Sequence, residues 1–109
     1  MAVSYGPVKT KLSTDYSVNM SSGGVFIETV SVLPVHTPLF VKFELPGREK
    51  PIVCKARVAW INGPEALKSP TLPPGMGLQF LGLSRAHVKA IEAVLTGDGT
   101  PVRGKLLPE

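Results

Sequence analysis

The stretch LFVKFELPGREKPIVCKARVAWI, residues 39–61, decides the fold class of this chain. Apolar and polar residues alternate over 39–45 and again over most of 52–61. Alternation with a period of two is typical of a strand with one buried face. The connection PGREKP at 46–51 is polar and contains proline and glycine, which favour turns. The stretch therefore predicts two strands joined by a turn.

Shorter runs on both sides extend this pattern. VFIET at 25–29 and GMGLQFL at 75–81 also alternate, and residues 7–18 predict one or two irregular strands. Glycine and proline, eleven of each, separate these runs, and four of the prolines fall within 62–74. We expect 62–74 to be a long loop and the chain to be mostly β.

The pattern changes near the C-terminus, where a helix is predicted over 84–96. Ser84 is a suitable N-cap, Ile91 and Leu95 recur at helical spacing, and Gly97 is a suitable stop. A sheet with free edges would pair with other chains, so it must close or be covered. We therefore expect a small closed or nearly closed antiparallel β-barrel with one C-terminal α-helix.

The predicted elements define one domain over residues 7–96, with flexible termini at 1–6 and 97–109. The alternation and the helical spacing place eight side chains on the apolar sides of their elements. The expected core contains Val41, Phe43, Cys54, Val58, Trp60, Leu78, Phe80 and Ile91.

The composition favours a binding module over an enzyme. The 109 residues carry a formal net charge of +4, and 43% of them are hydrophobic, which is typical of one folded domain. The single cysteine, Cys54, lies in an alternating run and predicts a buried thiol. No nucleophile, base and orienting group fall in a recognised order, and two separated histidines with one cysteine make no metal site. We expect no catalytic residue, no metal and no cofactor.

The sequence predicts neither membrane insertion nor nucleic-acid binding. The N-terminal MAVSYGPVKTK lacks the apolar segment of a signal peptide, and no stretch has the length of a transmembrane helix. We therefore expect a cytoplasmic location. Barrels that bind single strands stack bases on aromatic side chains. Aromatic residues are only 6% of this chain and mostly occupy predicted core positions, so we expect no nucleic-acid partner.

A polar turn, NMSSGG at 19–24, interrupts the segment DYSVNMSSGGVFIET. Asparagine, serine and glycine are good turn formers, and a plain turn is the simplest interpretation. The segment also resembles the PilZ family, whose pattern of Asp or Asn, any residue, Ser, two residues and Gly is filled by Asn19, Ser21 and Gly24. The later strands and the final helix follow in the family's order.

The resemblance implies recognition of cyclic di-GMP, a messenger with two guanines and two phosphates. Asn19 would offer an amide and Ser21 a hydroxyl to the ligand. Gly24 would allow a positive φ without a Cβ clash.

One part of the family's pattern is missing, because no arginine precedes Arg48. Ligand-binding members carry an upstream Arg-x-x-x-Arg, whose planar groups hold phosphates and stack on guanine. Here only Lys9 and Lys11 stand upstream, and they form either a weak phosphate site or two solvated charges.

Two functions are consistent with the missing upstream arginines. One is a cyclic di-GMP receptor with a degenerate, weak site, and the other is a protein-interaction adaptor for motility or type IV pilus control. For a protein partner, the helix over 84–96 and the loop over 62–74 are the expected contact regions.

Overall fold

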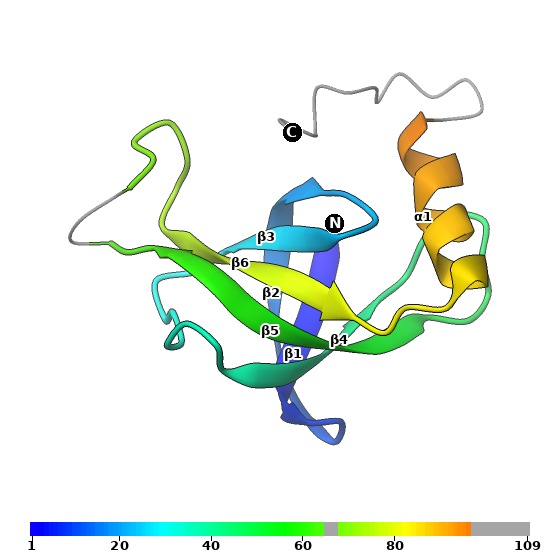
Figure 1. Cartoon of the computed structure of the whole chain (residues 1–109), viewed down its shortest axis with the longest axis horizontal. Coiled ribbons are helices and arrows are strands. Elements are labelled where there is room, and N and C mark those ends of the chain that lie inside the picture. The colour runs from blue at the N-terminus through cyan, green and yellow to red at the C-terminus, as the bar shows by residue number, and fades with distance from the viewer. Residues whose placement is uncertain (65–67, 97–109) are drawn as a thin grey trace.

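The computed structural model describes residues 1–64 and 68–96 and shows six strands followed by one helix (Figure 1). The elements are β1 (Ala2–Val8), β2 (Lys11–Met20), β3 (Gly24–Glu28), β4 (Pro38–Phe43), β5 (Ile52–Asn62), β6 (Gly75–Leu81) and α1 (Arg85–Thr96). All neighbouring strands pair antiparallel in the ring order β1-β2-β3-β6-β5-β4, and β1 pairs with β4 to close the barrel. The expected fold class is confirmed.

The alternation in the sequence decides which side chains fill the barrel. Leu39, Val41 and Phe43 of β4 are buried, whereas Lys42 between them is exposed. The ring of Phe43 stacks on that of Phe80, with 5.6 Å between centroids. Six of the eight expected core residues are buried together, namely Val41, Phe43, Val58, Leu78, Phe80 and Ile91. Cys54 is partly buried and packs against this core.

We expected residues 1–6 to be a flexible terminus, and this expectation is wrong. Strand β1 begins at Ala2, and Val3 and Tyr5 lie in the core. The Tyr5 hydroxyl also donates a hydrogen bond to Asp15 on β2. Closure explains the difference, since β1 fills the gap between β2 and β4 and so gains pairing on both sides. Residues 97–109, expected to be the other flexible terminus, lie outside the described residues.

The expectation that Trp60 belongs to the core is also wrong. The pairing of β5 with β6 shifts register between Val58, which faces Leu78, and Trp60, which faces Gly77. A bulge of this kind inserts one extra residue and turns the following side chains to the opposite face. Trp60 therefore lies on the outer surface of the barrel opposite Gly77, and Ile61, opposite the buried Met76, packs against the core instead.

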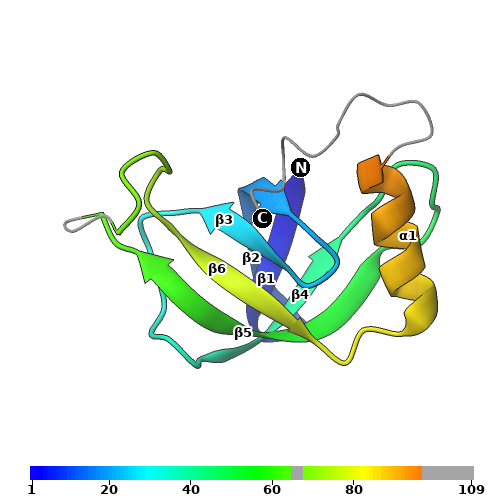
Figure 2. The ribbon, with the colours of Figure 1, turned by 45° about the horizontal axis from the view of Figure 1, so that its top comes forward.

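Helix α1 lies against one end of the barrel (Figure 2). Its start is as expected, because the Ser84 Oγ accepts a hydrogen bond of 3.1 Å from the His87 amide. Ile91 is fully buried against the strands, and Val94 and Leu95 are partly buried beside it. In the described part of the chain, no helix has the length and apolar character needed to cross a bilayer.

Candidate functional site

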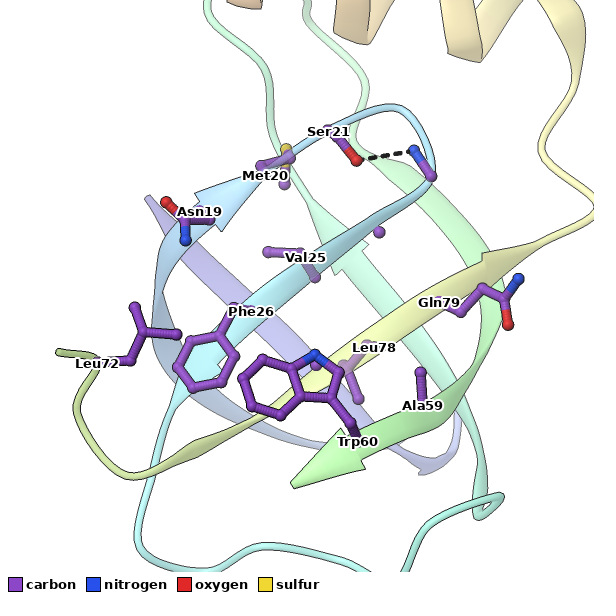
Figure 3. A pocket seen from close by; sticks show the side chains of 13 residues that line it. Asn19, Met20, Ser21, Val25, Phe26, Ala59, Trp60, Leu72, Leu78 and Gln79 are labelled. Carbon is purple, nitrogen blue, oxygen red and sulfur yellow. Dashed lines mark hydrogen bonds between the residues drawn. The ribbon is translucent and has the colours of Figure 1, made fainter. Parts of the chain in front are cut away.

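The NMSSGG segment forms the tight connection between β2 and β3 (Figure 3). The Ser21 amide donates to the Gly24 carbonyl at 2.9 Å, and the Gly23 amide donates to the Ser21 Oγ at 3.1 Å. The Phe80 amide also donates to the Gly23 carbonyl at 2.9 Å, which ties the turn to β6. The turn is therefore held from inside by its own serine and from outside by a neighbouring strand.

Gly24 is required here for a reason other than the one expected. Its φ is not in the left-handed region, which among the described glycines is occupied by Gly47 and Gly82. A Cβ on Gly24 would instead overlap the carbonyl oxygen of Leu78 on β6. The glycine allows close approach of two backbones and not a positive φ.

A groove of about 560 Å³ opens beside this turn on the outer surface of the barrel. Its walls come from the end of β2, the turn, strands β3, β5 and β6, and one residue of the loop before β6. The lining residues are Asn19, Met20, Ser21, Gly23, Gly24, Val25, Phe26, Ala59, Trp60, Leu72, Gly77, Leu78 and Gln79. All three residues of the expected motif therefore line one groove.

Two aromatic side chains make the apolar wall of the groove, and Figure 3 shows them side by side. The rings of Phe26 and Trp60 have centroids 5.2 Å apart and are tilted by 30°. A Cβ on Gly77 would overlap the Trp60 indole, and one on Gly75 would come too close to the Phe26 ring. The two glycines of β6 thus leave room for the rings, which in turn cover the bare backbone. Neither aromatic was predicted as a site residue, although the Gly-x-Gly pattern of β6 was an available signal.

The loop before β6 contributes Leu72 to the groove, and a buried asparagine holds this loop. Asn62 is 0% exposed, and its side-chain amide donates to the carbonyls of Ser69, Leu72 and Pro73 at 3.1, 3.2 and 2.9 Å. Its Oδ1 accepts from the Ser69 amide at 2.8 Å. The buried side chain therefore satisfies its polar atoms by fixing the loop. Nothing in the sequence singled out Asn62.

The turn also contacts helix α1. The Ser22 hydroxyl donates to the Glu92 carboxylate at 3.3 Å, across 70 residues of sequence. Helix α1 is therefore connected by a side-chain hydrogen bond to the turn that lines the groove.

The structure separates the two upstream lysines from this groove. Lys9 lies in the β1–β2 turn and Lys11 begins β2, whereas Asn19 lies near the far end of β2. Eight residues of strand span roughly 26 Å. The lysines therefore lie far from Asn19, Ser21 and Gly24.

The sheet register brings a different cation nearer to the groove. Gly24 pairs with Gln79, and Gln79 pairs with Arg57 on β5. Two strand spacings, roughly 10 Å, therefore separate Arg57 from the turn. A guanidinium nitrogen of Arg57 lies 3.0 Å from Nδ1 of His36. Arg57 is thus oriented by a neighbour on the β3–β4 connection.

Two titratable groups are shifted, and neither favours reaction. Burial raises the pKa of the Cys54 thiol to about 11, which leaves it protonated near neutral pH. Burial and the hydrogen bond to Asp15 raise the pKa of Tyr5 to about 12. Within residues 1–64 and 68–96, no three side chains of His, Cys, Asp and Glu cluster as metal ligands would.

Comparison with known proteins assigns the chain to one family. The family model described as "PilZ domain" matches residues 6–97 of the chain. A search of curated proteins found no match.

Proposed function

The chain belongs to the PilZ domain family, and we propose that it is a non-catalytic regulatory module that binds cyclic di-GMP in the groove beside the NMSSGG turn. The observation that carries the proposal is the position of Asn19, Ser21 and Gly24 around one groove with an aromatic wall. A groove of about 560 Å³ is within the usual range for a small-molecule ligand.

The groove offers the two kinds of contact that a guanine nucleotide needs. Trp60 and Phe26 give an apolar surface against which a purine can pack. The Ser21 hydroxyl already accepts a hydrogen bond from the turn, but its own hydrogen is left for a ligand acceptor. The turn is therefore held in place before ligand arrives, which lowers the entropy cost of binding.

The proposed binding is weak, because the groove has no cation in the place of the missing arginine pair. Each lost charge-assisted contact removes roughly 1.5–3 kcal/mol, so two losses weaken binding by about a hundredfold or more. Lys9 and Lys11 are too distant to replace them, and we leave both out of the site. Arg57 is the nearer candidate for a phosphate contact.

Calorimetric titration of the full chain with cyclic di-GMP, at low and moderate salt, tests the proposal. We expect a dissociation constant in the micromolar range or weaker, and a loss of binding in Asn19→Ala and Ser21→Ala. Ser13→Ala is the matched control, because Ser13 is exposed on the same strand, outside the groove. A parallel NMR titration should move the signals of residues 19–24. No heat and no shift at millimolar ligand would contradict the proposal.

The alternative function is a protein-interaction adaptor for motility or type IV pilus control that has lost cyclic di-GMP binding. The observation that favours it is the absence of any arginine before Arg48. The same titration separates the two functions, since an adaptor of this kind shows no shift with the messenger. A cytoplasmic location is part of both proposals, because a free thiol such as Cys54 persists in a reducing compartment.

A further inference from the structure

Acidic and basic side chains are unevenly distributed around the barrel. Strands β1, β4, β5 and β6 contain no aspartate and no glutamate, whereas β2 carries Asp15 and β3 carries Glu28. On the acid-free side, Lys42 of β4 and Lys55 of β5 are both exposed. Since β1, β4, β5 and β6 are consecutive in the ring, the strands on one side of the barrel carry basic side chains and no acidic ones, and the exposed Glu44 follows directly after β4.

The sheet register interleaves these cations with apolar side chains. Lys42 pairs with Val53, and Lys55 pairs with Phe40 on one side and Leu81 on the other. Val53 is 40% exposed and Leu81 is 38% exposed, so both leave apolar surface in contact with solvent. We define the basic face as Phe40, Lys42, Val53, Lys55 and Leu81.

Lys9 adds a third cation at the border of the basic face. Its ammonium lies over the ring of Phe40, 5.3 Å from the centroid. A cation over an aromatic ring is attracted by the negative face of the ring. Phe40 is thereby covered by a charge and does not present an open ring to a partner.

We propose that the basic face is a docking surface for an acidic segment of a partner protein, in which carboxylates alternate with aliphatic side chains. This site is separate from the groove and does not depend on cyclic di-GMP binding. Charge complementarity selects an acidic partner, and Val53 and Leu81 give its aliphatic residues a place to pack. Because the barrel is closed, the partner cannot add a strand to a free edge, and side chains must carry the recognition.

The spacing of the lysines fits such a segment. Lys42 and Lys55 are diagonal neighbours across β4 and β5, a relation that places side chains about 7–8 Å apart. Carboxylates two residues apart in an extended peptide are separated by about 7 Å. Both lysines can therefore engage successive carboxylates of one peptide.

The same face fits a single-stranded nucleic acid poorly. Bases need open aromatic rings for stacking, and the one aromatic residue of the basic face, Phe40, lies beneath Lys9. Aliphatic side chains between the cations favour a peptide over a sugar-phosphate chain.

NMR titration of the full chain with a synthetic peptide of alternating glutamate and leucine tests the proposal. We expect shifts at residues of the basic face and a dissociation constant that rises at least tenfold in Lys42→Glu/Lys55→Glu. Lys89→Glu is the matched control for each of the single variants Lys42→Glu and Lys55→Glu, because it makes the same change of charge at an exposed site on α1. Each single variant, with thermal unfolding measured alongside, separates loss of binding from loss of fold. Ser21→Ala should leave peptide binding unchanged.

Three outcomes would overturn the proposal. The first is a set of shifts scattered over the whole surface, or a loss of peptide binding in Lys89→Glu as large as that in Lys42→Glu or Lys55→Glu. The second is equal binding of a peptide in which glutamine replaces glutamate. The third is tighter binding of an oligothymidylate or of vesicles with anionic lipid than of the acidic peptide, which would assign the basic face to a different class of partner.

Discussion

At the scale of single residues, Asn62 has the most consequence for the site. It is the one buried polar side chain in the described part of the chain, and its four hydrogen bonds fix the loop that brings Leu72 to the groove. Removing a buried partner leaves the groups on the other side without their hydrogen bonds, which costs more than the bond itself contributes. One amide side chain thus affects both stability and the shape of the groove.

Asn62→Ala should lower the free energy of unfolding by about 3 kcal/mol, because several partly buried backbone groups lose their partner. The affinity for cyclic di-GMP should fall as well, since the position of Leu72 depends on this side chain. Denaturant unfolding and calorimetry measure the two effects. Leu72→Ala is the control, with reduced affinity and little loss of stability. An unchanged unfolding midpoint in Asn62→Ala would contradict the assigned role.

Cys54 should be slow to react, because burial raises the pKa of its thiol to about 11. The thiolate is the reactive form, so a pKa raised from its ordinary value of 9.0 to about 11 lowers the thiolate fraction near neutral pH roughly a hundredfold. Alkylation by iodoacetamide should therefore be about a hundredfold slower than in a free cysteine peptide and should accelerate as the pH rises toward 11. A rate equal to that of the peptide at neutral pH would show that the thiol is open to solvent.

At the scale of elements, the bulge in β5 decides what the outer surface of the barrel presents. It places both Trp60 and Asn62 on the outer face, where Trp60 packs on Gly77 and the loop before β6 covers Asn62. The groove and its loop therefore depend on one irregularity in one strand. Bulges of this kind commonly re-aim a side chain next to a functional site.

Gly77→Ala should displace the Trp60 indole, because the added methyl group would overlap it. We expect a loss of about 2 kcal/mol of stability, a shift in tryptophan emission toward that of an exposed indole, and weaker cyclic di-GMP binding. Trp60 is the only tryptophan, so the fluorescence reports this site alone. Gly23→Ala is the control for stability and emission, since a methyl group there meets only the Ser21 hydroxyl at 3.7 Å. Unchanged emission in Gly77→Ala would mean that Trp60 does not rest on β6.

At the scale of the whole molecule, closure of the barrel creates one core and two differently charged sides. Each strand points one set of side chains into the core and the other set outward. Because β1 closes the ring against β4, the lysines of β4 and β5 face away from Asp15 and Glu28 on β2 and β3. The core side chains therefore contribute most of the stability, and the outward side chains are the ones available for binding.

A comparison of Phe43→Ala with Phe40→Ala measures how much the inward and outward faces of β4 each contribute to stability. Phe43 is buried and stacked on Phe80, so its truncation should cost about 3–5 kcal/mol. Phe40 faces outward under Lys9, so its truncation should cost no more than about 1 kcal/mol. Thermal or denaturant unfolding compares the two. Equal losses would contradict the assignment of the two faces of β4.

The sequence by itself determined the class of fold, most of the core and the helix cap. Alternation over 39–45 and helical spacing after Ser84 are local patterns, and burial of one side follows directly from them. The turn with Asn19, Ser21 and Gly24 was also visible, because turn residues act over a few positions.

Three features could be read only from the folded chain: the position of β1, the outward turn of Trp60, and the distance of Lys9 and Lys11 from the groove. The physical reason is that each of these depends on pairing between strands far apart in the chain. A closing strand gains its stability from two neighbours, and a bulge changes the face of every residue after it. Neither effect leaves a periodic signal in the strand's own sequence.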